Sequence, residues 1–401
     1  MIDRMAGDAG QKVLLFLTAL VFFATLSLFS ANLRDLAPEG EPGSVVPNDF
    51  SAFWAAGRLG LAEPLAVLDE ARLSAVQNWG PDAKDPYFPF AYPPGWLVAV
   101  IPFGALPFAI AWPLFVLVGL AAFGAALWPS LPGMVAERRA LMLAALSPPL
   151  LFFVLLAGQT TLIWLALLLV AATALLSQKA LLAGAVVGLL AIKPQLCPMV
   201  AAAFLGYALS HVQARMAVPA AALSVLGVCL LPVLHTGWAY WPAWLGAAGT
   251  MAEQIALAAN AWDTMLSWYP ALRVAGLGHE AALSAQAAVS LSLAAGVAWL
   301  WWLKDVTASL RLAGLLLAIP LAAPSAWYYE GIAFALAAVF LAAARYDSTM
   351  GRRLHVILVW ALPGYLVPLG TVLALPLVTA PMASLLFIGV LREAALRRST
   401  A

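Results

Sequence analysis

The chain is a succession of apolar runs separated by short polar connections. A helix needs about 20 apolar residues to cross a hydrocarbon core of about 30 Å. Backbone groups in lipid have to pair within their own segment, so apolar runs of this length predict helices. Several of the runs are short, which is tolerated where a broken helix lines a cavity. The twelve candidate spans are 13–31, 108–128, 140–157, 160–176, 181–193, 196–210, 217–234, 281–303, 310–322, 331–344, 354–377 and 380–391.

The distribution of charge favours one topology for these spans. With the N-terminus inside and strict alternation, 14 of the 20 basic residues fall inside and 13 of the 19 acidic residues fall outside. Positive charge prefers the cytoplasmic side, so both termini are predicted to be cytoplasmic. The apolar run 93–107 is predicted to be a shallow, non-crossing helix, because a crossing there would move Arg138 and Arg139 outside. The run 13–31 is too long for the core of a signal peptide and predicts an uncleaved first helix.

Two long segments and one short segment then lie on the outer side. Segment 32–107 contains nine acidic residues, and segment 235–280 is rich in tryptophan, as expected for an aromatic belt at the membrane interface. The short segment is 323–330. No soluble domain and no internal repeat is evident, so the whole chain, 1–401, is predicted to be a single integral membrane domain.

The composition agrees with the membrane interpretation. Hydrophobic residues make up 64% of the chain and charged residues only 10%, against about 25% charged residues in a typical soluble domain. The net charge of +1 gives no indication of a nucleic-acid partner. Cys197 and Cys229 lie in apolar stretches without metal-ligand spacing and are predicted to be two buried thiols rather than a disulfide. The chain is predicted to be an all-α polytopic membrane protein that contacts membrane lipids.

The stretch from Asn48 to Leu61 contains the first candidate for chemistry. Its apolar positions have helical spacing and predict an amphipathic helix lying flat in the interface, with Asp49 at its N-terminus. Aspartate is among the best N-caps, so Asp49 can be a cap alone. The functional alternative is a carboxylate that takes a proton from an incoming hydroxyl. The apolar positions are Phe50, Phe53, Trp54, Gly57 and Leu61.

Two further motifs lie at helix boundaries. Tyr92 precedes two prolines that can begin a helix, and it can be part of a plain entry turn. The alternative is that Tyr92 and nearby Lys84 face a lipid headgroup. Gln159 follows Gly158 between two spans, where a polar amide needs partners. It contacts either neighbouring helices or a substrate.

Lys193 is the strongest anomaly in the pattern. It ends an apolar span on the outer side, against the charge bias, and is followed by Pro194 and Gln195. Ionisable residues at membrane depth are functional candidates, and lysine binds phosphate as a compact point charge. The structural alternative is a lysine that snorkels to the headgroups. Glu330, at the end of the 324–330 stretch, is either a helix cap beside anchoring aromatic residues or a site residue.

Several classes of site are missing from the sequence. There is no phosphate-cradling glycine loop, no dinucleotide-binding fingerprint and no His/Cys/Asp cluster with metal-ligand spacing. A nucleotide-driven pump and a cytoplasmic nucleotide-sugar enzyme are therefore disfavoured. We expect no cofactor and no metal ion.

Taken in order, these motifs resemble glycosyltransferase family 87, the bacterial membrane mannosyltransferase-like proteins of the GT-C fold. The shared pattern is Asp-Phe-x-x-Phe-Trp-x-Ala-Gly, Tyr-Pro-Pro, Gly-Gln, Lys-Pro-Gln, and a proline followed by Tyr-Asp/Glu. The resemblance implies a GT-C-like fold, a sugar donor carried on polyprenyl phosphate, and transfer at the periplasmic face of the bacterial inner membrane. It also implies that Asp49 is the catalytic base. The substrate-binding residues expected from the motifs are Arg58, Lys84, Tyr92, Gln159, Lys193, Gln195, Tyr329 and Glu330.

The sequence departs from the family pattern in two motifs. Thr160 and Thr161 follow Gly-Gln, where the family often has asparagine, and Trp327 and Glu330 stand where it often has histidine and aspartate. We expect Asp49 to deprotonate a hydroxyl of a glycolipid or glycan acceptor, which attacks a mannose-like hexose with inversion. Lys193 and Lys84 are expected to stabilise the leaving phosphate. The alternatives are a flippase for a lipid-linked sugar, which would have paired broken helices, and a non-catalytic assembly subunit.

Overall fold

The computed structural model describes residues 5–37, 44–77, 88–257, 259–346, 348–369 and 373–399, and their regular elements are all helices. This confirms the all-α prediction for the described residues. The first half contains α2 (Asp8–Arg34), α3 (Asp49–Gly60), η1 (Pro64–Leu68), α4 (Glu70–Gln77), α5 (Pro94–Gly104), α6 (Phe108–Ser130), α7 (Val135–Leu146), α8 (Pro149–Ala157), α9 (Thr161–Leu176), α10 (Ala180–Leu189), η2 (Leu190–Ile192), η3 (Pro194–Leu196) and α11 (Cys197–Ser210).

The second half continues in the same way, with short helices between long ones. Its elements are η4 (Val212–Met216), α12 (Ala217–Leu230), α13 (Val233–Thr236), α14 (Tyr240–Leu257), α15 (Ala259–Trp262), α16 (Trp268–Val274), α17 (His279–Trp302), α18 (Ala308–Ala322), η5 (Tyr328–Gly331), α19 (Ile332–Ala343), α20 (Met350–Leu366), η6 (Val367–Leu369) and α21 (Leu375–Ser399).

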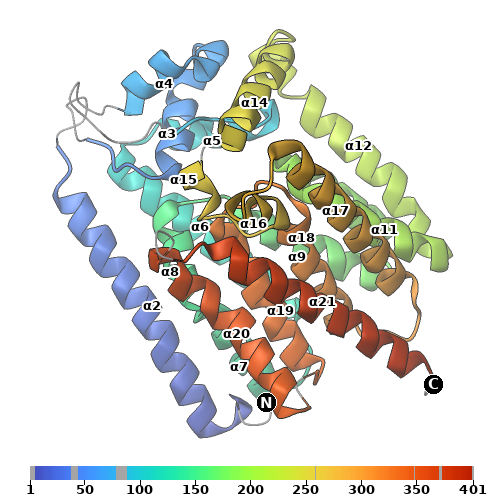
Figure 1. Cartoon of the computed structure of the whole chain (residues 1–401). Helices are drawn as coiled ribbons and strands as arrows, with labels where there is room; N and C mark the ends of the chain where they lie inside the picture. Colours follow the sequence, from blue (N-terminus) through green and yellow to red (C-terminus); the bar gives the residue numbers. More distant parts are fainter. Residues whose placement is uncertain are drawn as a thin grey trace.

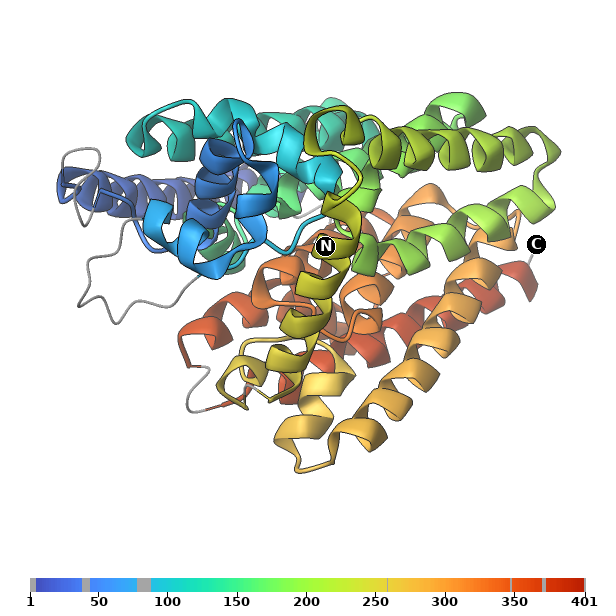
Figure 2. The ribbon, with the colours of Figure 1, turned by 90° about the horizontal axis from the view of Figure 1, so that it is seen from above.

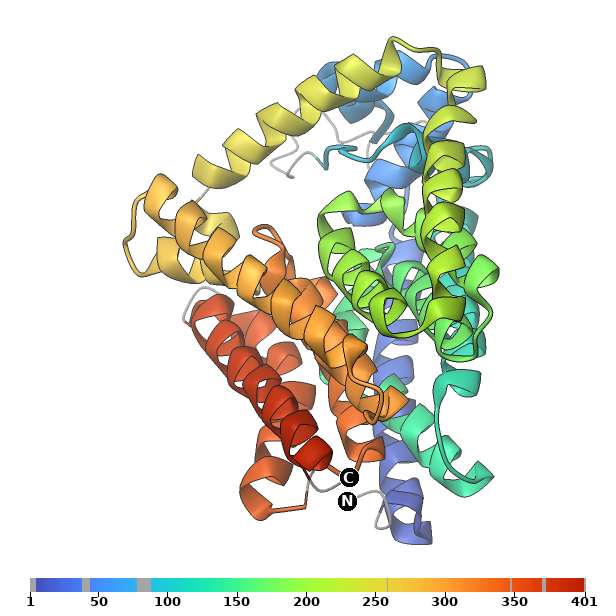
Figure 3. The same ribbon diagram turned by 90° about the vertical axis from the view of Figure 1, so that its right-hand side faces the viewer.

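The helices define two opposite ends of the molecule. The start of α2 and the end of α21 lie toward one end, whereas α3, α4 and α14 lie toward the other (Figures 1 and 3). Seen from above, α14 runs across the boundary between helices of the first half and helices of the second half (Figure 2). The candidate site residues lie at helix starts and in short connections between helices.

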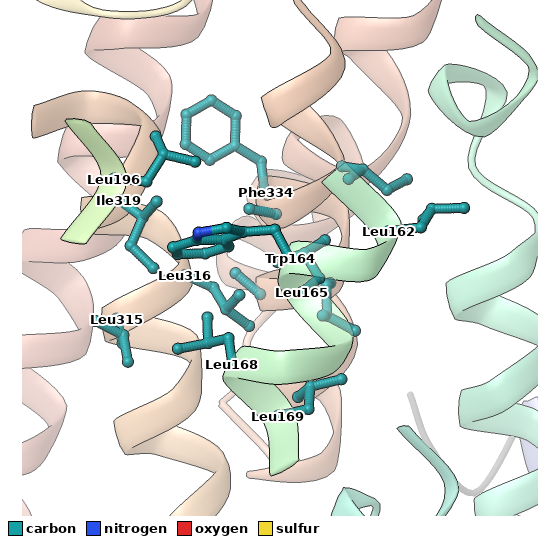
Figure 4. Packing of buried hydrophobic residues seen from close by; sticks show 14 of the residues in the cluster. Leu162, Trp164, Leu165, Leu168, Leu169, Leu196, Leu315, Leu316, Ile319 and Phe334 are labelled. Carbon is teal, nitrogen blue, oxygen red and sulfur yellow. The ribbon is translucent and has the colours of Figure 1, made fainter. Parts of the chain in front are cut away.

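Helices α18 and α19 form the centre of the core. Ser309 to Leu321 and Ile332 to Ala342 are buried at every position, as expected for helices that are apolar all round. Figure 4 shows the side chain of Trp164 in α9 packed among aliphatic residues of α18 and against Phe334 of α19. The indole Nε1 of Trp164 donates a hydrogen bond of 3.1 Å to the carbonyl of Leu190. This packing fixes the ends of α9, α19 and η2 relative to one another.

The helix lengths support only part of the predicted topology. Among the described residues, five helices are long and apolar enough to cross a membrane by themselves, or six when the bent pair of α7 and α8 is counted as one span. Five of the other predicted spans correspond to shorter apolar helices, which are α9, α10, α11, α18 and α19. The count of twelve crossings and the side of each loop stay predictions. The five spans are Asp8–Arg34, Phe108–Ser130, Val212–Thr236, His279–Trp302 and Leu375–Ser399.

Helix α3 is enclosed rather than one-sided, which corrects the amphipathic prediction. Nine of its twelve residues are buried, including small polar and alanine positions outside the apolar stripe. Leu61, which was predicted to be in the stripe, lies beyond the helix end and is 58% exposed. The helix is enclosed because α5 crosses it closely: a Cβ on Gly57 would lie 2.4 Å from the carbonyl oxygen of Val100. The helix predicted in 93–107 is confirmed as α5, and its shallow, non-crossing position stays a prediction.

Two other sequence predictions need correction. The predicted span 354–377 is divided, because α20 ends at Leu366 and α21 begins at Leu375. The apolar sequence runs through this break, so hydropathy does not reveal it. Cys197 and Cys229 are free, as predicted, but both are half-buried rather than buried.

Candidate active site

Asp49 is the first residue of α3. The N-cap of α3 is Asn48, whose side-chain Oδ1 accepts a hydrogen bond of 3.1 Å from the backbone N–H of Ser51. The interpretation of Asp49 as the cap is therefore wrong, because the preceding residue has that role. Asn48 Nδ2 also donates to the carbonyl of Leu156 in α8, at 3.2 Å. Asp49 is thus held at a helix start while its carboxylate is available for another partner.

That partner is Gln159, in the connection between α8 and α9. Gln159 Nε2 donates a hydrogen bond of 2.7 Å to Asp49 Oδ1. The preceding Gly158 has φ +63°, and a Cβ there would lie 2.6 Å from Cβ of Phe50. Glycine at 158 is needed both for the left-handed backbone and for the close approach to α3. The Gly-Gln motif therefore brings the amide to the aspartate.

The amide oxygen of Gln159 accepts hydrogen bonds from three donors. Gln159 Oε1 accepts from the hydroxyl of Tyr92 at 3.1 Å, from the backbone N–H of Thr160 at 3.2 Å and from Lys193 Nζ at 3.5 Å. Tyr92 lies just before α5, and Lys193 lies between η2 and η3. The motifs around Asp49, Tyr92, Gln159 and Lys193 thus meet at one amide group.

Lys193 forms a buried ion pair with Glu330. Its Nζ lies 2.7 Å from Glu330 Oε1 and 5.0 Å from the ring centre of Tyr329. Only 2% of Lys193 and 4% of Glu330 is exposed, so snorkelling to the headgroups is excluded for this lysine in the structure. Glu330 Oε2 accepts a second hydrogen bond, of 2.8 Å, from the backbone N–H of Trp327. The glutamate therefore caps η5 and pairs with the lysine at the same time.

The 324–330 loop is fixed by the segment before α16. The backbone N–H of Leu266 donates to the carbonyl of Ala326 at 2.9 Å, and Ser267 Oγ donates to the carbonyl of Pro324 at 3.0 Å. The sequence predicted segments 235–280 and 323–330 on the same side, and the structure joins them. Glu330 is thereby held at the end of α19 that faces Lys193.

The carboxyl group of Asp49 binds a proton more strongly than an ordinary aspartate does. Burial raises the pKa of Asp49 to about 6, and the hydrogen bond from Gln159 and the charge of Lys193 limit the rise. The residue is nonetheless half-buried, whereas Gln159, Lys193 and Glu330 are buried. Of the three charged residues of the cluster, Asp49 is thus the one that is partly exposed. A pKa near neutrality is what a general base requires.

Three of the expected substrate-binding residues are not seen in the cluster: two lie apart from it, and one lies outside the described residues. Arg58 is in the last turn of α3, with its guanidinium 5.1 Å from the ring centre of Trp54. Gln195 is exposed, although Lys193 two positions earlier is buried. Lys84 lies outside the described residues. The structure gathers Asp49, Tyr92, Gln159, Lys193, Tyr329 and Glu330.

Sequence reasoning missed the role of Asn48 and the contact between Lys193 and Glu330. Asn48 is itself a good N-cap residue, and that signal favoured the cap one position earlier. An acid and a base 137 positions apart carry no local signal, so their pairing had to come from the fold.

Two other observations concern cavities and metal ligands. A cavity of about 400 Å³ is lined by residues of α11, α17, α21 and the 303–306 connection, not by the cluster around Asp49. Among the described residues, no group of three or more His, Cys, Asp or Glu side chains could hold a metal ion. Metal independence stays a prediction.

The comparison with known families agrees with the motifs that meet in this cluster. The profile of glycosyltransferase family 87 matches residues 90–324, which is more than half of the chain. The chain belongs to glycosyltransferase family 87. No curated protein and no solved structure matches it. Family membership and the apolar helices together make this protein a membrane glycosyltransferase.

The matched region of this family 87 protein covers only part of the cluster. Tyr92, Gln159 and Lys193 lie within residues 90–324, whereas Asp49 and Glu330 lie outside them. The fold nevertheless connects Asp49 and Glu330 to the matched residues by hydrogen bonds of 2.7 Å each. The geometry therefore extends the candidate site of the glycosyltransferase beyond the matched region on both sides.

Proposed function

We propose that this protein moves a mannose-like hexose from a polyprenyl-phosphate donor to a hydroxyl of a glycolipid or glycan acceptor, with Asp49 as general base. The observation that carries the proposal is the carboxylate of Asp49, whose pKa burial raises to about 6 and whose Oδ1 accepts a hydrogen bond from Gln159. The other carboxylate oxygen takes the proton of the acceptor hydroxyl as that hydroxyl attacks the anomeric carbon. Phosphate is already a good leaving group, so one base suffices and a single displacement inverts the anomeric centre.

The proposed topology places this chemistry at the periplasmic face of a bacterial inner membrane. Asp49, Gln159, Lys193 and Glu330 come from four segments that charge alternation assigns to the same outer side. Hydrogen bonds connect these four residues into one cluster, which supports a shared side. We propose a GT-C-like arrangement with about twelve crossings, some made by short or broken helices, and with both termini cytoplasmic.

The proposed chemistry requires a lipid-linked donor. A polyprenyl-phosphate sugar stays in the bilayer, so its phosphate and sugar have to reach the protein at headgroup height. The expected phosphate partner, Lys193, is balanced by Glu330 at 2.7 Å in this arrangement. The charge of Lys193 is therefore paired within the protein, and the proposal does not depend on a direct contact between Lys193 and phosphate.

The first prediction concerns donor class. In liposomes containing the purified protein and a glycolipid acceptor, we expect transfer of labelled hexose from polyprenyl-phosphate hexose and no transfer from the matching nucleotide sugar. The product should have the anomeric configuration opposite to that of the donor. Movement of intact donor between leaflets without product would indicate a flippase instead. Absence of both would favour an assembly subunit.

A further inference from the structure

The buried ion pair is connected to Asp49 through a single amide group. Glu330 Oε1 accepts from Lys193 Nζ at 2.7 Å, Lys193 Nζ donates to Gln159 Oε1 at 3.5 Å, and Gln159 Nε2 donates to Asp49 Oδ1 at 2.7 Å. Four segments that are distant in sequence thus form one chain of donors and acceptors. The last contact is with the proposed base.

The chemistry of the surrounding groups determines the orientation of Gln159. Lysine has donors only, and an ionised aspartate has acceptors only. The amide oxygen therefore belongs on the side of Lys193, the hydroxyl of Tyr92 and the backbone N–H of Thr160, and the amide nitrogen belongs on the side of Asp49. Exchanging the two amide atoms would place N–H groups against Lys193 and an oxygen against a carboxylate. Lys193 is thus one of the groups that point the amide N–H at Asp49.

Lys193 is itself held from several sides. Of the three N–H donors of an ammonium group, one binds Glu330 and another approaches Gln159, while the group lies 5.0 Å from the ring centre of Tyr329. Glu330 is fixed in turn by the backbone N–H of Trp327. An ammonium ion buried to this degree needs such a partner, because an unpaired charge in the interior is strongly unfavourable. The pair is thereby fixed in position behind Gln159.

We propose, on the basis of the transferase function above, that Lys193 and Glu330 are positioning residues for Asp49 rather than residues that touch the sugar donor. Lys193 orients the Gln159 amide so that its N–H groups face the Asp49 carboxylate. Glu330 keeps Lys193 in place and balances its charge. The family motif Lys-Pro-Gln and the variant motif that ends in Glu330 thus act on the base through Gln159.

The two members of the pair act on Asp49 with opposite electrostatic sign. The positive charge of Lys193 favours the ionised carboxylate, and the negative charge of Glu330 opposes it. The other titratable groups that face Asp49 are the phenols of Tyr92, Tyr328 and Tyr329. Phenols are neutral near pH 6, so Lys193 and Glu330 are the charged neighbours that can move the titration of Asp49.

This difference in sign gives the second prediction, a pair of shifts in the pH dependence of kcat/KM. The wild-type profile should fall about tenfold per pH unit below pH 6, because protonated Asp49 cannot act as base. Lys193→Met should move this acid limb to higher pH by about one unit or more. Glu330→Gln should move it to lower pH. If Lys193 and Glu330 only supported the fold, the two variants would change the rate without moving their acid limbs in opposite directions.

Two further variants keep the test decisive if a single change prevents folding. The double variant Lys193→Met/Glu330→Gln removes both charges, and its limb should lie between those of the single variants. Gln159→Met keeps the side-chain length without its donor, so it should lower kcat and move the limb to higher pH. The matched controls are Lys179→Met and Glu253→Gln, which change exposed residues and should leave the profile unchanged.

The outcomes separate this inference from the proposed function. If the wild-type protein transfers no sugar, the function and the inference both fail. If the wild-type limb lies near pH 6 and disappears in Asp49→Asn, the base assignment holds. The inference alone is then overturned if Lys193→Met and Glu330→Gln shift the limb in the same direction, or if neither shifts it.

Discussion

Asp49→Asn should lower kcat for sugar transfer by about 10²–10⁴-fold, the range that a positioned general base contributes. This substitution should remove the base without disturbing the start of α3. Asn48, not Asp49, caps α3, and an asparagine oxygen at position 49 can still accept the hydrogen bond from Gln159. The fold should therefore be retained while the proton acceptor is lost. The measurement is single-turnover transfer from polyprenyl-phosphate hexose, with the unfolding temperature of each protein as the check on folding.

The matched control for this change is Asp69→Asn. Asp69 is an exposed aspartate of the same outer segment and accepts a hydrogen bond from the backbone N–H of Arg72. Its replacement should leave kcat within about twofold of the wild-type value, since surface substitutions are usually small in effect. A folded Asp49→Asn protein with full activity would remove Asp49 from the mechanism.

Lys193→Met should destabilise the protein by about 3–5 kcal/mol, because it leaves Glu330 buried without its counter-charge. Glu330→Gln should have a similar effect, because it leaves Lys193 buried without its counter-charge. Both groups are almost completely buried, and their atoms lie 2.7 Å apart. The double variant Lys193→Met/Glu330→Gln should recover most of the loss, since it leaves no unpaired charge in the interior. Unfolding temperatures and thermal inactivation rates in detergent measure these differences.

The exposed pair of Arg72 and Glu63 is the control for this comparison. Their side chains are 50% and 58% exposed, with a closest N–O distance of 2.9 Å. Arg72→Met should change stability by no more than about 1 kcal/mol, because solvent screens surface ion pairs. If Lys193→Met and Arg72→Met have equally small effects, the lysine and glutamate are not paired in the interior as described.

The sequence predicted the helical class and most helix positions, because apolar periodicity directly reflects burial along the chain. It failed where the signal is ambiguous. The apolar run near Leu366 hides a helix break, and α3 is enclosed because α5 approaches its small residues closely. That enclosure depends on a second element, so the composition of α3 alone predicted a one-sided helix. Short helices packed in the core and short membrane spans have the same apolar composition, so the twelve crossings stay a prediction.

The candidate site was predicted as a set of motifs but not as an arrangement. Lys193 stood out because a charge at the end of an apolar run is unfavourable without a partner. The identity of that partner was not readable, since Glu330 lies 137 residues away. Asp49 was assigned correctly to the start of a helix. That Asn48 rather than Asp49 is the N-cap follows from the extended backbone of Asn48, which only the structure shows. Arg58 and Gln195 were grouped with the site because they belong to its motifs, but Arg58 lies over Trp54 and Gln195 is exposed.

The most direct test of the central claim is a density map of the protein with a non-hydrolysable polyprenyl-phosphate hexose bound in lipid nanodiscs. If Asp49 is the base, sugar density should lie beside it, with space for an acceptor hydroxyl within hydrogen-bond distance, about 2.6–3.2 Å, of the carboxylate. Lys193 should remain in contact with Glu330 and Gln159. Well-resolved sugar density on another part of the protein, with only side chains or lipid tails around Asp49, would rule out Asp49 as the base.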